Sequence, residues 1–92
     1  MNVPEEIRKR LSALQPLRLD IIDQSAMHAG HEGSKGGGGH YAMTIVSPMF
    51  AGLGTITRHR LVYDAIATLM KHEIHALSLT TLSPEETGRD RT

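Results

Sequence analysis

Two stretches of the chain place apolar residues at the spacing of an amphipathic helix. The first covers residues 4–14, and the apolar positions on its common face are Ile7, Leu11 and Leu14. Pro4 and the two acidic residues after it suit the first turn of a helix, and Pro16 ends the stretch. The second covers residues 55–71, and its apolar stripe consists of Leu61, Val62, Ala65, Ile66, Leu69 and Met70. The pattern therefore predicts a short amino-terminal helix and a longer helix in the second half of the chain.

Three other stretches have the composition of β-strands. Residues 17–23 begin with strict alternation, and the inner side of this strand is formed by Leu17, Leu19 and Ile21. Residues 40–47 predict its hairpin partner, and residues 74–82 predict a third strand. The sequence SPEE that follows has the cap, proline and acids of a helix start. We therefore expect a short helical turn there and a frayed tail over residues 87–92.

The order helix, strand, strand, helix, strand predicts a small α+β domain. The connection from the second strand through the longer helix to the third strand can form a right-handed crossover, which sets those two strands parallel. We expect one domain over residues 1–92, with a mixed three-stranded sheet covered by helices on one face.

Composition narrows the classes of function. Lys and Arg together number 10, as do Asp and Glu, and a zero net charge argues against strong sequence-independent binding to nucleic acid or anionic membranes. The chain has no cysteine, so it has no disulfide framework and no thiolate chemistry of its own. It contains no apolar run near the roughly 20 residues of a membrane span, and the first ten residues lack the apolar stretch of a secretory signal. These features predict a soluble, cytoplasmic protein.

Glycine and histidine are concentrated between the first two predicted strands. Residues 28–39 end in four consecutive glycines, and we expect them to form a flexible loop. The chain has 6 histidines, and two pairs have H-x-x-H spacing: His28 with His31, and His72 with His75. Any one of them is more often a polar surface residue than a ligand, because metal binding needs several ligands that the fold brings together.

Two kinds of site can be excluded from the sequence, a phosphate-binding P-loop and a nucleophile elbow, whereas the role of a basic cluster stays open. The stretch GHEGSKGGGGH does not match the phosphate-binding P-loop, and the chain has no nucleophile elbow. Arg58, His59 and Arg60 place positive charge near the start of the longer helix, where the helix dipole disfavours it. This cluster is either a solvated helix end or a docking patch for an anion or an acidic partner.

Several motifs, in this order along the chain, resemble those of the BolA family. They are the F-x-G turn at Phe50 and Gly52, the RHRLVY helix start over residues 58–63, and the IHALSL strand over residues 74–79. The histidine- and glycine-rich loop before the second strand is similar as well, so the resemblance runs from about residue 4 to residue 87. It implies an αββαβ fold similar to a class II KH domain.

The resemblance also implies a function. Members of the BolA family form heterodimers with monothiol glutaredoxins and share a bridging [2Fe–2S] cluster, serving iron–sulfur trafficking or iron homeostasis rather than catalysis. A glutaredoxin cysteine and a glutathione thiol hold one iron, and the BolA-like protein holds the other. Carried over to this chain, the ligands are His75 and His40, with His31 and His28 as loop alternates for His40. The glycine-rich loop would let His40 swing toward iron.

Two positions in this scheme can be placed further. Arg58 and Arg60, with His59 between them, are expected on the cluster side, facing the partner or the glutathione carboxylates. His75 shares the parity of the inward-facing Leu77 and Leu79, so it points toward the core unless it lies at the very end of its strand.

A second function comes from another class. The KH-like fold and the family's association with transcriptional regulation suggest a nucleic-acid-binding regulator, with DNA as the partner. The neutral charge and the lack of a G-x-x-G loop on a basic surface weigh against it. In either case the free chain is expected to be a monomer or a weak homodimer.

Overall fold

The computed structural model describes residues 2–24 and 39–90 of the chain. Its helices and strands, in order, are α1 (Val3–Leu11), β1 (Arg18–Asp23), β2 (Gly39–Val46), α2 (Thr55–Ala65), β3 (Ile74–Leu82) and α3 (Pro84–Asp90). Short 3-10 turns join them at Ser12–Leu14, Pro48–Phe50 and Leu69–Lys71. Most of the predicted loop, residues 28–38, lies outside the described residues, and residue 39 already belongs to β2.

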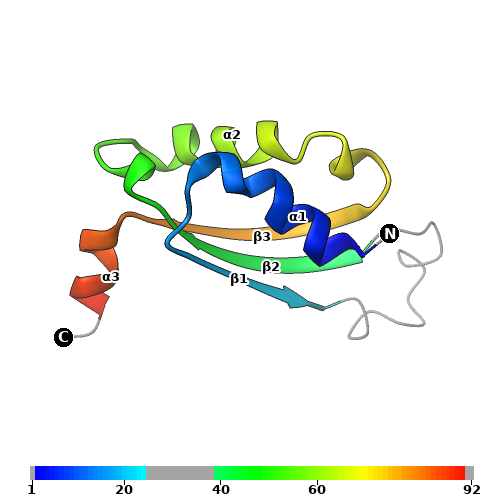
Figure 1. Cartoon of the computed structure of the whole chain (residues 1–92), viewed down its shortest axis with the longest axis horizontal. Coiled ribbons are helices and arrows are strands. Elements are labelled where there is room, and N and C mark those ends of the chain that lie inside the picture. The colour runs from blue at the N-terminus through cyan, green and yellow to red at the C-terminus, as the bar shows by residue number, and fades with distance from the viewer. Residues whose placement is uncertain (1, 25–38, 91–92) are drawn as a thin grey trace.

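The three strands form one sheet in the order β1-β2-β3. β1 runs antiparallel to β2, and β2 runs parallel to β3 because α2 crosses over between them. Figure 1 shows α1 and α2 lying side by side over one face of this sheet. The predicted α+β domain with a mixed three-stranded sheet is therefore confirmed.

The core lies between the sheet and these two helices. Its buried side chains come from α1 and the turn after it, from alternate positions of β2, from α2 and the turns on either side of it, and from the start of β3: Ile7, Leu11, Leu14, Tyr41, Met43, Ile45, Phe50, Val62, Ile66, Leu69 and Ile74. With one Phe and no Trp in the chain, the core depends on aliphatic packing around Phe50, which is fully buried. No helix in the described part of the chain is long and apolar enough to cross a membrane.

The longer helix is shorter than the sequence predicts. The spacing predicts a helix to residue 71, but α2 ends at Ala65, and Ile66 leaves the helical region with a φ of -113°. The chain then tightens into a 3-10 turn, after which the His72 amide donates to the Leu69 carbonyl at 3.4 Å. This tighter path keeps Ile66 and Leu69 in the core while the chain reverses direction to enter β3.

One prediction at the end of an element is also wrong. Leu17 is 68% exposed rather than inward-facing, because β1 begins one residue later, after a turn in which Gln15 adopts a left-handed φ of 51°. The expected short helical turn after Ser83 is α3, which extends to Asp90 and so covers the first part of the predicted tail, and the Thr87 hydroxyl donates to the Pro84 carbonyl at 2.7 Å. Residues 91 and 92 of that tail lie outside the described part.

Candidate functional site

Two histidines meet where the parallel strands begin. His40 is the second residue of β2 and His75 is the second residue of β3. The centroids of their rings lie 5.2 Å apart, and the ring planes are tilted by 39°. The structure therefore brings together the two ligands expected from the sequence. The alternates His28 and His31 lie outside the described residues.

A β-bulge determines where His75 points. Gly39 pairs with Ile74, but His40 pairs with Ala76, so β3 has one extra residue at this place and that residue is His75. Ile74 is 2% exposed and Leu77 packs against the core, which the strict two-residue period of a strand does not allow. The bulge resolves this conflict and leaves His75 exposed. His75 thus does not follow the inward parity of Leu77 and Leu79, in line with the exception expected for a residue at the very end of the strand.

His40 is held more deeply than a loop residue would be. Its carbonyl accepts a hydrogen bond from the Gln24 amide at 2.7 Å, and β3 pairs with it on the other side. The Nε2 atom of its ring is buried, and the ring adjoins a cavity of about 310 Å³ that also touches Ala76 and Ser78. The idea that His40 swings on a flexible loop is therefore wrong, because its backbone is fixed within the sheet.

The geometry of the pair fits the binding of one metal ion. A metal–nitrogen bond of about 2.1 Å and a tetrahedral angle place the centroids of two bound imidazoles roughly 5 Å apart. The observed 5.2 Å agrees with that arrangement. Among residues 2–24 and 39–90, no group of three or more His, Cys, Asp or Glu side chains could hold a metal ion. Within the described structure, a metal ion at this pair would need further ligands from elsewhere.

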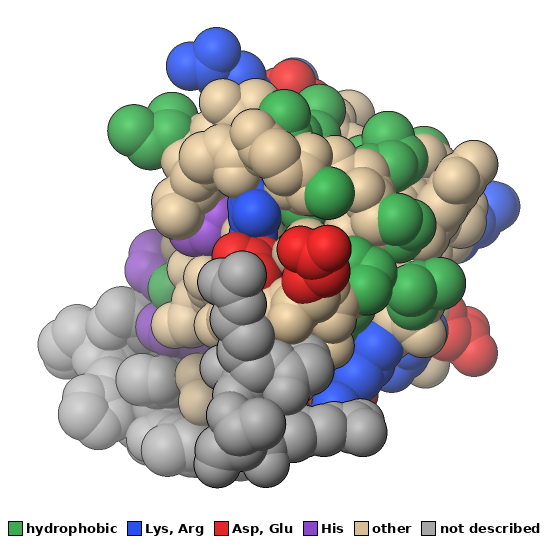
Figure 2. All heavy atoms as spheres, turned by 90° about the vertical axis from the view of Figure 1, so that its left-hand side faces the viewer, with side chains coloured by type: hydrophobic (Ala, Val, Ile, Leu, Met, Phe, Trp, Pro, Cys, Tyr) green, Lys and Arg blue, Asp and Glu red, His purple; other side chains and the backbone are tan. Residues whose placement is uncertain are grey.

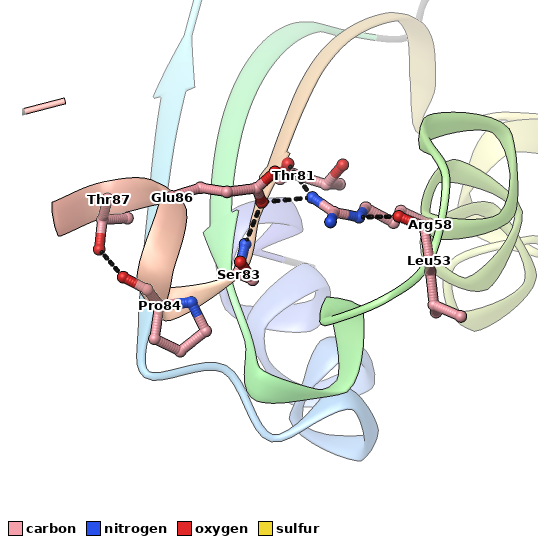
Figure 3. Close-up of polar contacts among 7 residues, drawn as sticks. All are labelled: Leu53, Arg58, Thr81, Ser83, Pro84, Glu86 and Thr87. Atoms are coloured by element: carbon pink, nitrogen blue, oxygen red, sulfur yellow. Dashed lines mark hydrogen bonds and ion pairs between the residues drawn. The ribbon is translucent and has the colours of Figure 1, made fainter. Parts of the chain in front are cut away.

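Arg58 occupies a different setting, inside the opposite end of the domain. Its Nε donates to the Leu53 carbonyl at 2.8 Å, and its Nη1 donates to the Thr81 carbonyl at 3.1 Å and to Glu86 Oε1 at 2.6 Å (Figure 3). The guanidinium lies over the Phe50 ring, 5.9 Å from its centroid. Arg58 is 9% exposed. It therefore joins α2 to β3 and α3, and the expectation that it faces outward toward a partner is wrong.

Glu86 completes this arrangement as an ionised carboxylate. The same oxygen that accepts from Arg58 also accepts from the Ser83 amide at 2.6 Å. The hydrogen bond from Arg58, followed by that from the Ser83 backbone, lowers the pKa of Glu86 to about 2. The sequence carried a signal for the contact between Ser83 and Glu86, because S-x-x-E at the start of a helix is the pattern of a capping box. It carried none for the contact with Arg58.

The two sites lie at opposite ends of the sheet. The Thr81 carbonyl bound by Arg58 is six residues along β3 from His75, which corresponds to roughly 20 Å. Figure 1 shows α2 beginning at the end of the sheet where β3 finishes. The expectation that the arginines of the RHR motif lie beside the cluster ligands is therefore wrong.

The rest of the RHR motif lies on the outer side of α2. Arg60 is exposed and His59 is half-buried, and together with Thr55, Ile56 and Tyr63 they line a shallow pocket of about 390 Å³. Figure 2 views the molecule from the end of the sheet where α2 begins and shows hydrophobic side chains gathered over the helical part of the molecule.

Comparison with known protein families gives a consistent picture. The family model described as BolA-like protein matches residues 11–86. An uncharacterized protein encoded in the cobS 5' region of Sinorhizobium sp is 36% identical over 97% of this chain and 99% of its own length. The DNA-binding transcriptional regulator BolA of Vibrio cholerae is 39% identical over 91% of this chain and 77% of its own length. The chain spans only 24% of another relative, the SufE-like protein 1 of Arabidopsis thaliana, at 36% identity.

Solved structures show the same similarity in three dimensions. BolA1 from Arabidopsis thaliana superimposes with a TM-score of 0.80 at 38% identity, covering 94% of this chain and 96% of that one. The BolA domain of SufE1 from Arabidopsis thaliana gives a TM-score of 0.78 at 37% identity, with the same coverage.

Proposed function

This chain belongs to the BolA family, and on that premise we propose that it is a non-enzymatic partner of a monothiol glutaredoxin. Its cargo is a [2Fe–2S] cluster shared with the glutaredoxin and glutathione, for iron–sulfur trafficking or iron homeostasis. The observation that carries this proposal is the pair of imidazoles from His40 and His75, whose ring centroids are 5.2 Å apart.

The incompleteness of the pair supports a shared site. A structural metal site within one chain is normally closed by four protein ligands. Here two imidazoles stand at one end of the sheet, and the chain has no cysteine to complete a cluster. His40 and His75 would hold one iron, and the thiols for the other iron would come from the partner and glutathione. Two imidazoles on one iron give such a cluster a higher reduction potential than four thiolates do.

The chain itself contributes position and access. The bulge presents His75 at the surface, where a second protein can reach it, while the sheet holds the backbone of His40. Since the backbones of both residues are part of the sheet before a partner arrives, less backbone entropy is lost on metal binding than with ligands from a loop.

The test is to reconstitute the chain anaerobically with a monothiol glutaredoxin, glutathione and iron, and to record visible circular dichroism. We expect the spectrum of a mixed complex, and we expect His75→Ala to replace it with the spectrum of the glutaredoxin homodimer. His72→Ala is the matched control, because His72 is an exposed residue in the turn just before β3. If the wild-type chain leaves the glutaredoxin spectrum unchanged, the proposed function is wrong.

A second function has a specific observation in its favour. Relatives from Vibrio cholerae and Escherichia coli, 39% and 33% identical, are named DNA-binding transcriptional regulators. This chain would then bind DNA as a regulator, with the weak electrostatic contribution that its zero net charge allows. Retardation of a DNA duplex at physiological salt, persisting in the presence of competitor DNA, would favour this function over the first.

A further inference from the structure

We propose that the outer face of α2 is a second docking surface, which binds an acidic amphipathic helix of another protein. The surface consists of Ile56, His59, Arg60 and Tyr63, and we call it the α2 stripe. The proposal does not depend on metal binding, because neither His40 nor His75 lines this pocket, and α2 begins at the end of the sheet where β3 finishes.

The spacing of the α2 stripe suits a helical partner. Its four residues stand at positions i, i+3, i+4 and i+7, so they form one continuous ridge along two turns of α2. A ridge of this kind packs into the groove of a second helix that has apolar residues at the same spacing. The pocket of about 390 Å³ between these side chains and Thr55 has room for apolar side chains from such a helix.

The exposure of the α2 stripe needs an explanation. Ile56 is 77% exposed and Tyr63 is 36% exposed, although both lie on a helix whose other face carries the fully buried Val62. The described part of the chain has only three other large apolar side chains that are comparably exposed, namely Leu17, Ile22 and Met49. Exposed apolar side chains along one helix face, with a cation between them, are typical of a protein-binding surface.

Charge selects an acidic partner rather than a neutral one. None of the five residues that line the pocket is acidic, and Arg60 supplies its positive charge at the exposed edge. Arg58 adds nothing to this surface, because its guanidinium is buried against Glu86. A glutamate or aspartate on the partner helix can pair with Arg60 while its apolar neighbours contact Ile56 and Tyr63.

The same charges disfavour a nucleic acid at this place. Nucleic-acid surfaces need several cations to neutralise successive phosphates. The α2 stripe offers one arginine, and the exposed Asp64 follows directly after Tyr63. A single carboxylate within an apolar helix matches this surface better than a polyanion does.

The α2 stripe is also rigid. The inner face of α2 is fixed by the buried Val62 and by the three hydrogen bonds of Arg58. A rigid helix loses little conformational entropy on binding, which lowers one part of the cost of association.

The experiment uses the metal-free full chain without glutaredoxin, so its result is independent of cluster binding. The probe is a fluorescent, end-capped synthetic helix of about 15 residues. It has leucines at i, i+3, i+4 and i+7 and glutamates beside them. A second probe has lysines in place of the glutamates. We measure affinity by fluorescence anisotropy and locate the contact from amide chemical-shift changes.

The acidic probe should bind, and the amide chemical-shift changes should be centred on α2. The lysine probe should bind at least about tenfold more weakly. Ile56→Ser and Tyr63→Ser should each weaken the acidic probe by about tenfold, and Arg60→Glu should reverse the preference between the probes. Leu17→Ser and Ile22→Ser are matched controls, because these exposed apolar residues lie outside the stripe. They should leave the affinity unchanged.

Three results would overturn the proposal. The first is equal binding of the two probes, which would mean that charge does not select the partner. The second is an equal loss of affinity in Leu17→Ser or Ile22→Ser, which would mean nonspecific apolar binding. The third is movement of the α2 amides by a single-stranded DNA oligonucleotide and not by the acidic helix.

Discussion

The two ends of the sheet use their polar residues in opposite ways. At one end, the guanidinium of Arg58 is surrounded by the Leu53 and Thr81 carbonyls, a carboxylate and an aromatic ring, and little of it reaches solvent. At the other end, His75 is displaced out of the strand register into solvent beside a second imidazole. We call the first the closed end, because the polar groups of Arg58 are bound within the protein, and the second the open end, because His75 is accessible to a partner. The contrast shows that an arginine in a basic motif can be structural, whereas a histidine in a strand of core residues can be available for binding.

The closed end should contribute most to the stability of the fold, so Arg58→Met should have the largest effect on the free energy of unfolding. This substitution keeps much of the side-chain volume but leaves two backbone carbonyls and one carboxylate without their donor. We expect the free energy of unfolding in urea to fall by about 3 kcal/mol. The control is Arg60→Met, which removes the neighbouring exposed arginine and should change the stability by less than about 0.5 kcal/mol. Equal effects of the two variants would contradict the structural role of Arg58.

Acid should weaken the same end. The folded-state pKa of Glu86 is about 2, below its ordinary value of 4.5. Its contribution to stability is therefore complete above about pH 4.5 and is lost as the pH falls toward 2. Thermal unfolding followed between pH 6 and about pH 2.5 should show this loss in the wild-type chain. Glu86→Gln should be less stable at pH 6 and should depend less on pH below 4.5, whereas Glu85→Gln, at the exposed neighbouring acid, should follow the wild type.

The turn before α2 gives a smaller effect on the closed end. Gly52 has a φ of +78°, and a methyl group added there would meet nothing within 4 Å. The strain of Gly52→Ala is thus conformational and not steric, and we expect it to lower the unfolding free energy by about 1 kcal/mol. Gly52→Asn should recover part of the loss, because asparagine tolerates the left-handed region better than alanine. Asn and Ala variants of equal stability would contradict this reasoning, and urea unfolding measures both.

How well the sequence predicts each feature of the fold depends on how far apart along the chain the interacting residues lie. The pattern predicts β3 over its observed bounds and the buried face of α2, because both follow from local periodicity. It does not predict the end of α2 at Ala65, where the reversal into β3 overrides the helical period. The role of Arg58 depends on Glu86, which is 28 residues away, and no local pattern joins the two.

The candidate site was predictable only in part. Its two histidines follow from the resemblance to the BolA family, and the structure places them together. The bulge that exposes His75 was missed because a strict two-residue period assumes a regular strand. A signal for it was present, since Ile74 and Leu77 are apolar residues three positions apart in a strand with one buried face.

The open end, at His40 and His75, should contribute least to the stability of the fold and most to binding. Alanine variants of these two histidines test this contrast with the closed end. His75 is exposed, so His75→Ala should change the unfolding free energy by less than about 0.5 kcal/mol. Both proposed ligands sit on paired strands rather than on a loop, and no third metal-ligating side chain joins them among the described residues. We therefore expect His40→Ala to shorten the lifetime of the cluster formed with a monothiol glutaredoxin as severely as His75→Ala, measured from the decay of visible circular dichroism. A clearly milder effect of His40→Ala would mean that His28 or His31 can take its place, and that the rigid pair is not the ligand set.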